Sequence, residues 1–155
     1  MKLSKIIDQE LILLELISEN TNEVLKEMTG ILKEKGRISD GKSILNKLME
    51  REKLASTSIG KQTAIPHAKI KDLKNPIIMI ALSRKGFLYN SNDSELVNLI
   101  VLVLSPSGAP ALHLQILAAA ASLIKKPGKL IEELLNAKNN SELLETIRKF
   151  EEIND

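Results

Sequence analysis

The chain has 155 residues, a formal net charge of +2 and no cysteine. This length fits a single domain, 1–155, with one hydrophobic core, and the lack of cysteine excludes disulfides, thiolate metal sites and a cysteine nucleophile. Aromatic residues make up only 2% of the sequence, which argues against a nucleic-acid binder that stacks bases on aromatic platforms. The 22 basic and 20 acidic side chains are interspersed, whereas a nucleic-acid footprint needs clustered positive charge.

The apolar segments are those of a soluble protein. Asp8, Glu10 and Glu15 interrupt the first apolar residues, which is unlike a signal peptide. The longest apolar run, residues 99–104, is far below the roughly 20 residues needed to span a bilayer. We therefore expect a cytoplasmic protein with no direct membrane insertion.

The first elements in chain order are a strand and a helix. Residues 11–16 are mostly leucine and isoleucine and predict a strand. Apolar residues then recur at three- and four-residue steps. This period predicts a helix that begins at an N-cap on Thr21 or Asn22 and ends at Gly36.

A second helix is expected after an N-cap on Ser39 or Asp40, and it carries Arg51 near its end. An arginine in a last helical turn already suits the helix dipole, so its position alone assigns it no function. Residues 55–62 are small or polar and predict a loop.

The histidine His67 follows a short extended piece, 63–65, because the residue before Pro66 is held in β or polyproline geometry. We expect His67 to lie in a loop at the end of this piece. Two continuous apolar runs, 77–82 and 97–104, then predict buried central strands of a sheet covered on both faces.

The last part of the chain is helical. Residues 86–93 predict a turn-rich connection and 105–110 a loop. Helices are expected at 111–124, at 130–135 and after a cap on Ser141. The order of elements predicts an α/β fold with a small β-sheet flanked by helices on both faces.

The chemistry of this sequence centres on its two histidines, His67 and His113. Each has an ordinary explanation: His67 as a surface loop residue, and His113 as a packing residue in the first turn of a helix. A residue there need not be buried, so we expect replacement of His113 to affect chemistry more than folding. The positive end of that helix disfavours an imidazolium and attracts anions.

Several site types are excluded by the residues. Two histidines without cysteine make a poor zinc site, and the sequence contains no Gly-x-Ser-x-Gly elbow, Walker A loop or Gly-x-Gly-x-x-Gly motif. What remains is a neutral imidazole that attacks phosphorus, with a second imidazole, Arg51 and the hydroxyls of Ser56 and Thr57 to hold phosphoryl oxygens.

A longer motif sharpens this hypothesis. The segment Arg51-Glu-Lys-x-x-Ser-Thr-x-Ile-Gly-x-x-x-Ala-Ile-Pro-His67, followed by His113-Leu-x-x-Leu-Ala, resembles the enzyme IIA domain of the fructose–mannitol class of the bacterial phosphoenolpyruvate-dependent phosphotransferase system. The resemblance extends over nearly the whole chain. It implies the mannitol-type IIA fold, a mixed sheet flanked by helices.

The resemblance also implies roles for individual residues. His67 matches the histidine that accepts a phosphoryl group from the phosphocarrier HPr and passes it to a IIB domain of a sugar permease. His113 matches a second histidine that orients or stabilises the phosphoryl group, and Arg51 an arginine beside it. Ser56 and Thr57 match hydroxyls of the loop. No metal, nucleotide or other cofactor is implied.

A second branch of the same family suggests an alternative function. In nitrogen-type regulatory IIA proteins, the phosphorylation state controls binding to a partner protein. A degenerate relative that is never phosphorylated is a third hypothesis, because several positions depart from the family pattern.

The departures lie mainly around the loop. The family usually has glycine where this chain has Ala55, Ser58, Gln62 and Ala68, an aliphatic residue at Thr63, and proline at Leu96. A non-glycine residue at any position that needs a positive φ is expected to cost about 1–2 kcal/mol.

Overall fold

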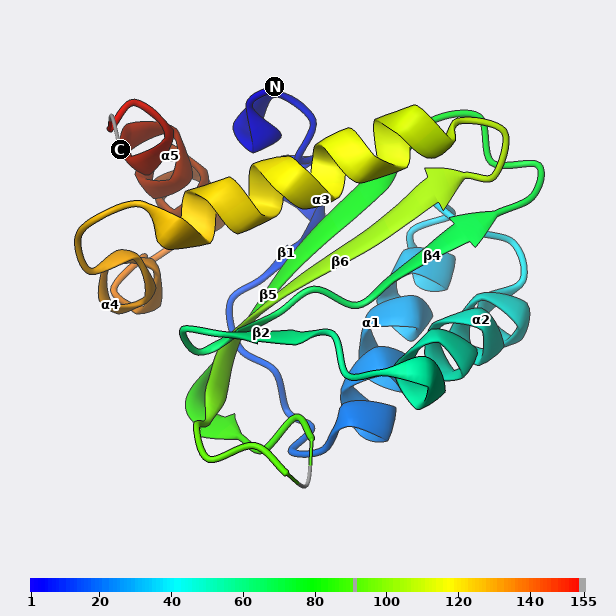
Figure 1. The fold of residues 1–155 in the computed structure, drawn as a ribbon, viewed down its shortest axis with the longest axis horizontal. Coiled ribbons are helices and arrows are strands. Elements are labelled where there is room, and N and C mark those ends of the chain that lie inside the picture. Colours follow the sequence, from blue (N-terminus) through cyan, green and yellow to red (C-terminus); the bar gives the residue numbers. More distant parts are fainter. Residues whose placement is uncertain (91, 154–155) are drawn as a thin grey trace.

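The computed structural model describes residues 1–90 and 92–153, and the chain forms one six-stranded mixed sheet with helices on both faces (Figure 1). The expected fold class is therefore confirmed. The expected domain, 1–155, includes residues 91, 154 and 155, which lie outside the described residues. The elements are η1 Leu3–Lys5, η2 Gln9–Leu11, β1 Ile12–Leu13, α1 Thr21–Glu34, α2 Gly41–Leu54, β2 Ser58–Gly60, β3 Thr63–Ala64, β4 His67–Ile70, β5 Ile77–Phe87, β6 Val97–Pro106, α3 Pro110–Lys125, α4 Leu130–Leu135 and α5 Asn140–Glu151.

The two long strands β5 and β6 form the antiparallel centre of the sheet. β1 runs parallel to β5 on one side. On the other side β3 and β4 lie one after the other along β6, both parallel to it, and β2 pairs antiparallel with β3. The segments before and after Pro66 therefore both pair with β6. In the second segment, His67 lies opposite Val103.

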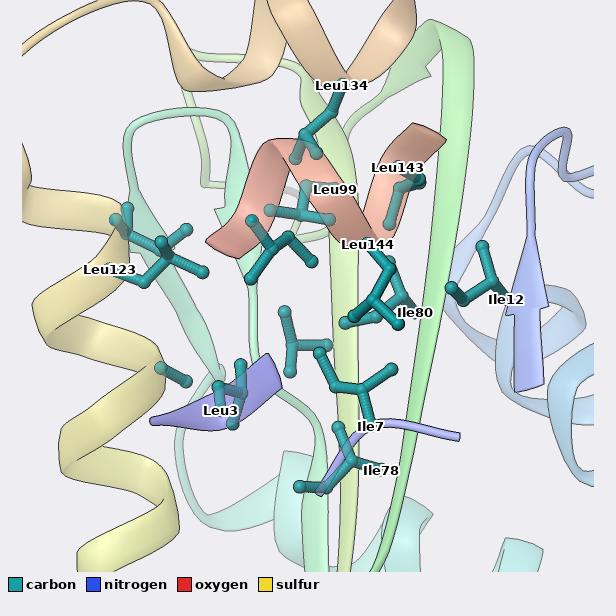
Figure 2. Close-up of a cluster of buried hydrophobic side chains, with 14 of the residues drawn as sticks. Leu3, Ile7, Ile12, Ile78, Ile80, Leu99, Leu123, Leu134, Leu143 and Leu144 are labelled. Atoms are coloured by element: carbon teal, nitrogen blue, oxygen red, sulfur yellow. The ribbon is translucent and has the colours of Figure 1, made fainter. Parts of the chain in front are cut away.

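The structure has two hydrophobic cores, one on each face of the sheet, rather than the single core expected, and they explain the apolar runs 77–82 of β5 and 99–104 of β6. Alternate side chains of β6 belong to different clusters: Val103 faces the cluster covered by α3, α4 and α5, and its neighbour Leu102 the one covered by α1 and α2. Figure 2 shows part of the first cluster, where leucines of α3, α4 and α5 meet isoleucines of the sheet. Strand segments buried on both faces favour apolar side chains at every position, so the middle of β6, residues 99–104, reads as an unbroken apolar run.

Several expected boundaries are wrong. The first strand covers only Ile12–Leu13 rather than 11–16: a 3₁₀ helix capped by the Asp8 carboxylate occupies Gln9–Leu11, and the pairing with β5 ends at Leu13. The N-caps of α1 and α5 are Asn20 and Asn139, one and two residues before the expected ones. Asp40, one of the two expected caps, does cap α2, where its carboxylate accepts from the Ser43 N–H.

The expected loop 55–62 is also wrong, because it contains strand β2. The polar composition hides the strand, which lies at the end of the sheet order and whose exposed side chains need not be apolar. A two-residue turn joins β2 to β3, with Lys61 at φ +53° and Gln62 at φ +61°. Positive φ at both central residues is what a tight β-hairpin turn requires.

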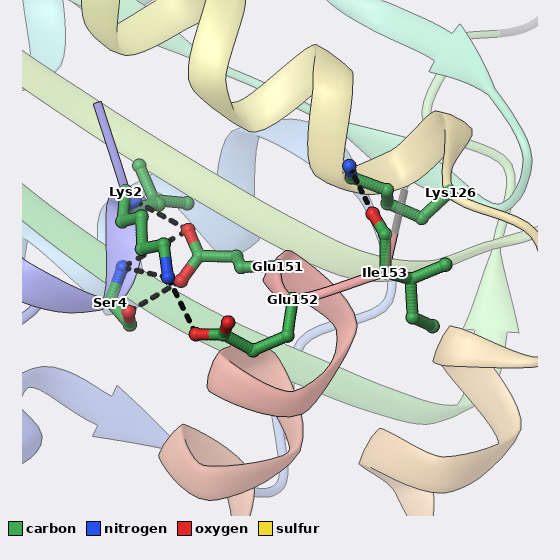
Figure 3. A network of polar contacts seen from close by, with 7 residues as sticks. Lys2, Ser4, Lys126, Glu151, Glu152 and Ile153 are labelled. Atoms are coloured by element: carbon green, nitrogen blue, oxygen red, sulfur yellow. Dashed lines mark hydrogen bonds and ion pairs between the residues drawn. The ribbon is translucent and has the colours of Figure 1, made fainter. Parts of the chain in front are cut away.

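The N-terminal segment is tied to the end of α5 (Figure 3). The Glu151 carboxylate accepts from the Leu3 N–H at 2.6 Å and from the N–H and hydroxyl of Ser4. Leu3 is fully buried, and Ser4 is 7% exposed. Glu152, the residue after Glu151, instead makes an exposed ion pair with Lys2.

Glu151→Ala is expected to lower the free energy of unfolding by about 1.5–3 kcal/mol, because buried donors of η1 lose a charged acceptor. Glu152→Ala is the matched control, and it is expected to leave stability nearly unchanged because its ion pair is solvated. Urea denaturation of both variants checks the difference. Equal effects of the two replacements would contradict this account.

Candidate phosphoryl-transfer site

The three main candidate residues line one cavity. His67 begins β4, His113 lies on α3, and Arg51 lies in the last turns of α2, so β4, α3 and α2 each contribute a residue to the lining. The cavity has a volume of about 620 Å³. Its lining includes Lys47, Arg51, His67, Lys69, His113 and Leu114.

His67 is the first residue of β4 rather than a loop residue, so that expectation is wrong. Its Nδ1 atom lies 2.7 Å from the carbonyl oxygen of Ile65. Because a carbonyl oxygen can only accept, Nδ1 carries the proton and the lone pair of the neutral ring is on Nε2. The strand therefore fixes both the ring and its tautomer.

A hydrogen bond to β6 holds the ring of His113. Its Nδ1 lies 2.8 Å from the hydroxyl oxygen of Ser105, which is fully buried. His113 itself is only 4% exposed, so the premise that a residue at the helix start need not be buried does not apply to it. Pro110 opens the helix, and the His113 N–H already donates to the Ala109 carbonyl, so the side chain points back towards the sheet.

The two imidazoles lie side by side, with ring centroids 5.3 Å apart and planes tilted by 54°. Burial lowers the pKa of His67, and the positive charges of Arg51 and Lys69 lower it further, against the raising effects of the Ile65 carbonyl and of Glu52. Burial also lowers the pKa of His113, as do His67 and Lys69. Both rings are therefore neutral at pH 7, and a neutral imidazole has the free electron pair that a nucleophile needs.

Arg51 and two lysines give the cavity its positive charge. The Arg51 guanidinium donates to the carbonyl oxygen of Ala55 at 2.8 Å, and this bond uses one of its five N–H groups. Lys47 and Lys69 are exposed and line the same cavity. Exposed leucines at its rim, Leu54 at 83% and Leu114 at 67%, give the mouth an apolar border.

The two loop hydroxyls are not among the residues that line this cavity. Ser56 accepts a hydrogen bond from the Ser58 N–H at 3.1 Å and shapes the turn into β2. Thr57 is buried, and its hydroxyl contacts Glu52 and Tyr89. The part that either hydroxyl plays in holding phosphoryl oxygens remains a prediction.

Among the four positions where the family usually has glycine, Ala55, Ser58, Gln62 and Ala68, only Gln62 takes a positive φ. Ala55 has φ −170°, and Ser58 lies in β2. Gln62 is held by its surroundings, since its side-chain amide donates to Asn98 at 2.8 Å and its carbonyl accepts from the Asn98 and Leu99 N–H groups. The lost glycines therefore leave β4 and the cavity formed.

Sequence reasoning missed Ser105, Lys47 and Lys69 as parts of the site. Lys69 follows His67 by two residues and so shares its face of the strand, which is a signal the sequence does contain. Ser105 and Lys47 carry no such signal, because their positions depend on the register of β6 with β4 and on the approach of α2.

Stability is expected to fall as the pH drops below about 6.5, the ordinary pKa of histidine. The folded chain holds both histidines at lowered pKa values, so the unfolded chain binds more protons in this range and stability rises with pH. Urea denaturation at about pH 5.5 and about pH 7.5 measures the difference. A variant that lacks both imidazoles should lose this part of the slope, and an unchanged slope would contradict the account.

Within residues 1–90 and 92–153, no group of three or more His, Cys, Asp or Glu side chains is placed to hold a metal ion. In the same ranges, no helix is both long enough and apolar enough to cross a membrane.

Comparison with known proteins places the chain in a family. Residues 5–150 match the family model described as "Phosphoenolpyruvate-dependent sugar phosphotransferase system, EIIA 2". The chain is 28% identical to the fructose-specific EIIABC component of Bacillus subtilis over 97% of its own length, but it spans only 24% of that protein. It is 31% identical to the fructose-specific EIIA component of Haloferax volcanii, over 88% of each chain.

Solved structures share the fold. The nitrogen regulatory protein IIA-Ntr of Neisseria meningitidis matches with a TM-score of 0.80 and 23% identity, over 93% of this chain and 97% of that one. The mannitol enzyme IIA of Escherichia coli, solved in complex with phosphorylated enzyme IIB, matches with a TM-score of 0.76 and 18% identity, over 92% and 97%. The chain therefore has the fold of these proteins and a neutral histidine pair beside an arginine in one cavity. It belongs to the EIIA 2 family of the phosphoenolpyruvate-dependent sugar phosphotransferase system.

Proposed function

We propose that this protein is a phosphohistidine carrier, in which Nε2 of His67 accepts a phosphoryl group from an HPr-type phosphocarrier and passes it to the IIB component of a sugar permease. The observation that carries the proposal is the hydrogen bond between His67 Nδ1 and the Ile65 carbonyl. It leaves a neutral ring whose lone pair is on Nε2, in a cavity shared with Arg51 and His113.

The transfer balances without a cofactor. The Nε2 lone pair forms a bond to phosphorus while the bond between phosphorus and the donor atom breaks, and that electron pair stays with the donor. The transferred group carries negative charge on its equatorial oxygens, so catalysis is positioning and charge stabilisation. Arg51, Lys47 and Lys69 supply positive charge. The Ile65 carbonyl, which accepts the Nδ1 hydrogen bond, stabilises the positive charge that develops on the His67 ring.

The partners follow from the relatives. The B. subtilis protein carries A, B and C components in one chain, and the mannitol IIA of E. coli forms a complex with phosphorylated IIB. A shallow positive cavity with an apolar rim suits a protein-bound phosphoryl group better than a small free substrate, because the rim can pack against the partner's surface.

The test uses phosphoenolpyruvate, enzyme I and HPr with the full chain. We expect the mass to rise by one phosphoryl group, on the peptide that contains His67, with the acid lability and alkali stability of a phosphohistidine. Addition of the IIB portion of the B. subtilis fructose component should then discharge the label. No label, or label on another residue, would overturn the proposal.

The regulatory alternative predicts a different second step. A nitrogen-type IIA would also take up the label, but it would keep it in the presence of IIB domains and would bind its partner in only one phosphorylation state. Label that persists with every IIB domain offered, together with state-dependent capture of another protein, would favour that function.

A further inference from the structure

The residue after Arg51 is the centre of a hydrogen-bonded cluster beside the site. Glu52, on α2, accepts from the Thr57 N–H at 3.1 Å, from the Thr57 hydroxyl and from the Tyr89 hydroxyl at 2.7 Å. Thr57 and Tyr89 are 4% and 5% exposed. One carboxylate thus joins the end of α2, the loop before β2 and the connection between β5 and β6.

Both hydroxyl donors of this cluster already have an acceptor. The Tyr89 hydroxyl proton goes to Glu52, and so does the Thr57 hydroxyl proton. A hydroxyl has one proton to donate, so the Thr57 oxygen has acceptor capacity only. An acceptor repels phosphoryl oxygens, which are themselves acceptors with negative charge. Thr57 is therefore unsuited to bind the phosphoryl group directly.

A chain of hydrogen bonds runs from this cluster to His67. The Thr57 carbonyl accepts from the Ile65 N–H at 2.9 Å. On the other side of the same residue, the Ile65 carbonyl faces His67 Nδ1 at 2.7 Å. Movement of Thr57 would thus move Ile65, whose carbonyl sets the tautomer of the nucleophile.

The cluster is anchored on its far side as well. The Thr21 hydroxyl donates to the Tyr89 carbonyl oxygen, and the Tyr89 ring lies 6.1 Å from that of Phe87. The desolvated Tyr89 hydroxyl, next to the Glu52 carboxylate, has its pKa raised and so remains a proton donor. The Thr57 loop is therefore held between two helices and the end of β5.

We propose that Thr57, Glu52 and Tyr89 are positioning residues that hold the Ile65 carbonyl against His67 and so keep its nucleophilic nitrogen free for phosphoryl transfer. The proposal rests on the proposed function of His67. It gives the loop threonine a structural role in catalysis in place of contact with the phosphoryl group.

The main variant is Thr57→Val, which keeps the shape of the side chain and removes the hydroxyl. We expect a mixture of His67 tautomers in ¹⁵N NMR spectra, and phosphoryl transfer at saturating donor slowed by up to about 100-fold. Thr57→Ser should restore both because it keeps the hydroxyl. Thr146→Val on α5 is the matched control for loss of a threonine hydroxyl far from the site.

A further variant and a stability measurement keep the test independent of folding. Tyr89→Phe removes one donor of the cluster and keeps the ring that packs on Phe87, so it should show a smaller effect in the same direction. Melting temperatures identify any variant that fails to fold.

Glu52→Gln adds a readout that loss of structure would not reproduce. The charged groups around His67 are Arg51 and Glu52 on α2 and Lys69 on β4, with the neutral His113 on α3. Because Glu52 raises the pKa of His67, its neutralisation should lower that pKa in an NMR titration. A loosened loop would instead expose the ring and raise the pKa.

Either of two results would overturn the positioning role. One is a slowed transfer in Thr57→Val with an unchanged His67 tautomer, which would make Thr57 a direct phosphoryl ligand. The other is an unchanged rate and tautomer in Thr57→Val and Tyr89→Phe. The tautomer measurement needs no phosphoryl group, so if the wild-type chain takes up no label, the proposed function fails while this test still stands.

Discussion

Replacement of His67 by asparagine is expected to abolish phosphoryl uptake while the fold stays intact. The asparagine amide can donate to the Ile65 carbonyl in place of Nδ1, but it has no nucleophilic nitrogen in place of Nε2. With the nucleophile removed and the other histidine, His113, only 4% exposed, the label from phosphorylated HPr should fall to background. Intact-mass spectrometry after incubation with the donor system measures this.

The control for this result is the melting temperature of the variant. His67 is half-buried and begins β4, so His67→Asn should keep the melting temperature close to that of the wild type. Label that remains in His67→Asn, with the mass shift moved to the peptide containing His113, would contradict the assignment. It would make the buried ring of His113 the acceptor and His67 its neighbour.

The central strands could be predicted from the sequence because their signal is strong and local. Residues of β5 and β6 that face opposite cores are adjacent in the chain, so burial on both faces gives one long apolar run. The predicted helices α1, α2, α3 and α5 likewise follow from three- and four-residue spacing. Their ends could not be placed to the residue, because a cap depends on one side chain: Asn20 caps α1, directly before the expected Thr21 or Asn22.

Strand β2 and the short extent of β1 could not be predicted for the opposite reason. Each has two or three residues, and each is defined by the partner it pairs with rather than by its own composition. The pairing of Ser58 with Ala64 depends on a turn with two positive φ values, at Lys61 and Gln62. Neither lysine nor glutamine is a residue type that indicates such a turn.

The site residues could be named from the motif, but their arrangement could not. Sequence reasoning grouped Ser56 and Thr57 as equivalent loop hydroxyls, whereas the structure gives them different partners. The difference arises from Tyr89, which lies far along the chain and reaches Glu52 only because the connection between β5 and β6 folds back on α2. Long-range contacts of this kind leave no periodic pattern in a single sequence.

His113→Ala is expected to weaken both phosphoryl transfer and folding. His113 is 4% exposed and its Nδ1 is hydrogen-bonded to the hydroxyl of Ser105, so loss of the imidazole leaves a small cavity and a buried hydroxyl without this partner. We expect the free energy of unfolding to fall by about 2–4 kcal/mol. Transfer should slow by about 100-fold or more, since a group beside the developing phosphoryl charge is lost.

A double-mutant cycle with Ser105→Ala separates these two effects. Because the double variant has no unpaired hydroxyl, it should be more stable than the sum of the single changes predicts, by about 1 kcal/mol. Its transfer rate should stay as low as that of His113→Ala, since the imidazole is still absent. Normal transfer in His113→Ala, despite a large loss of melting temperature, would reduce His113 to a core residue and leave Arg51 and the lysines to hold the phosphoryl group on His67.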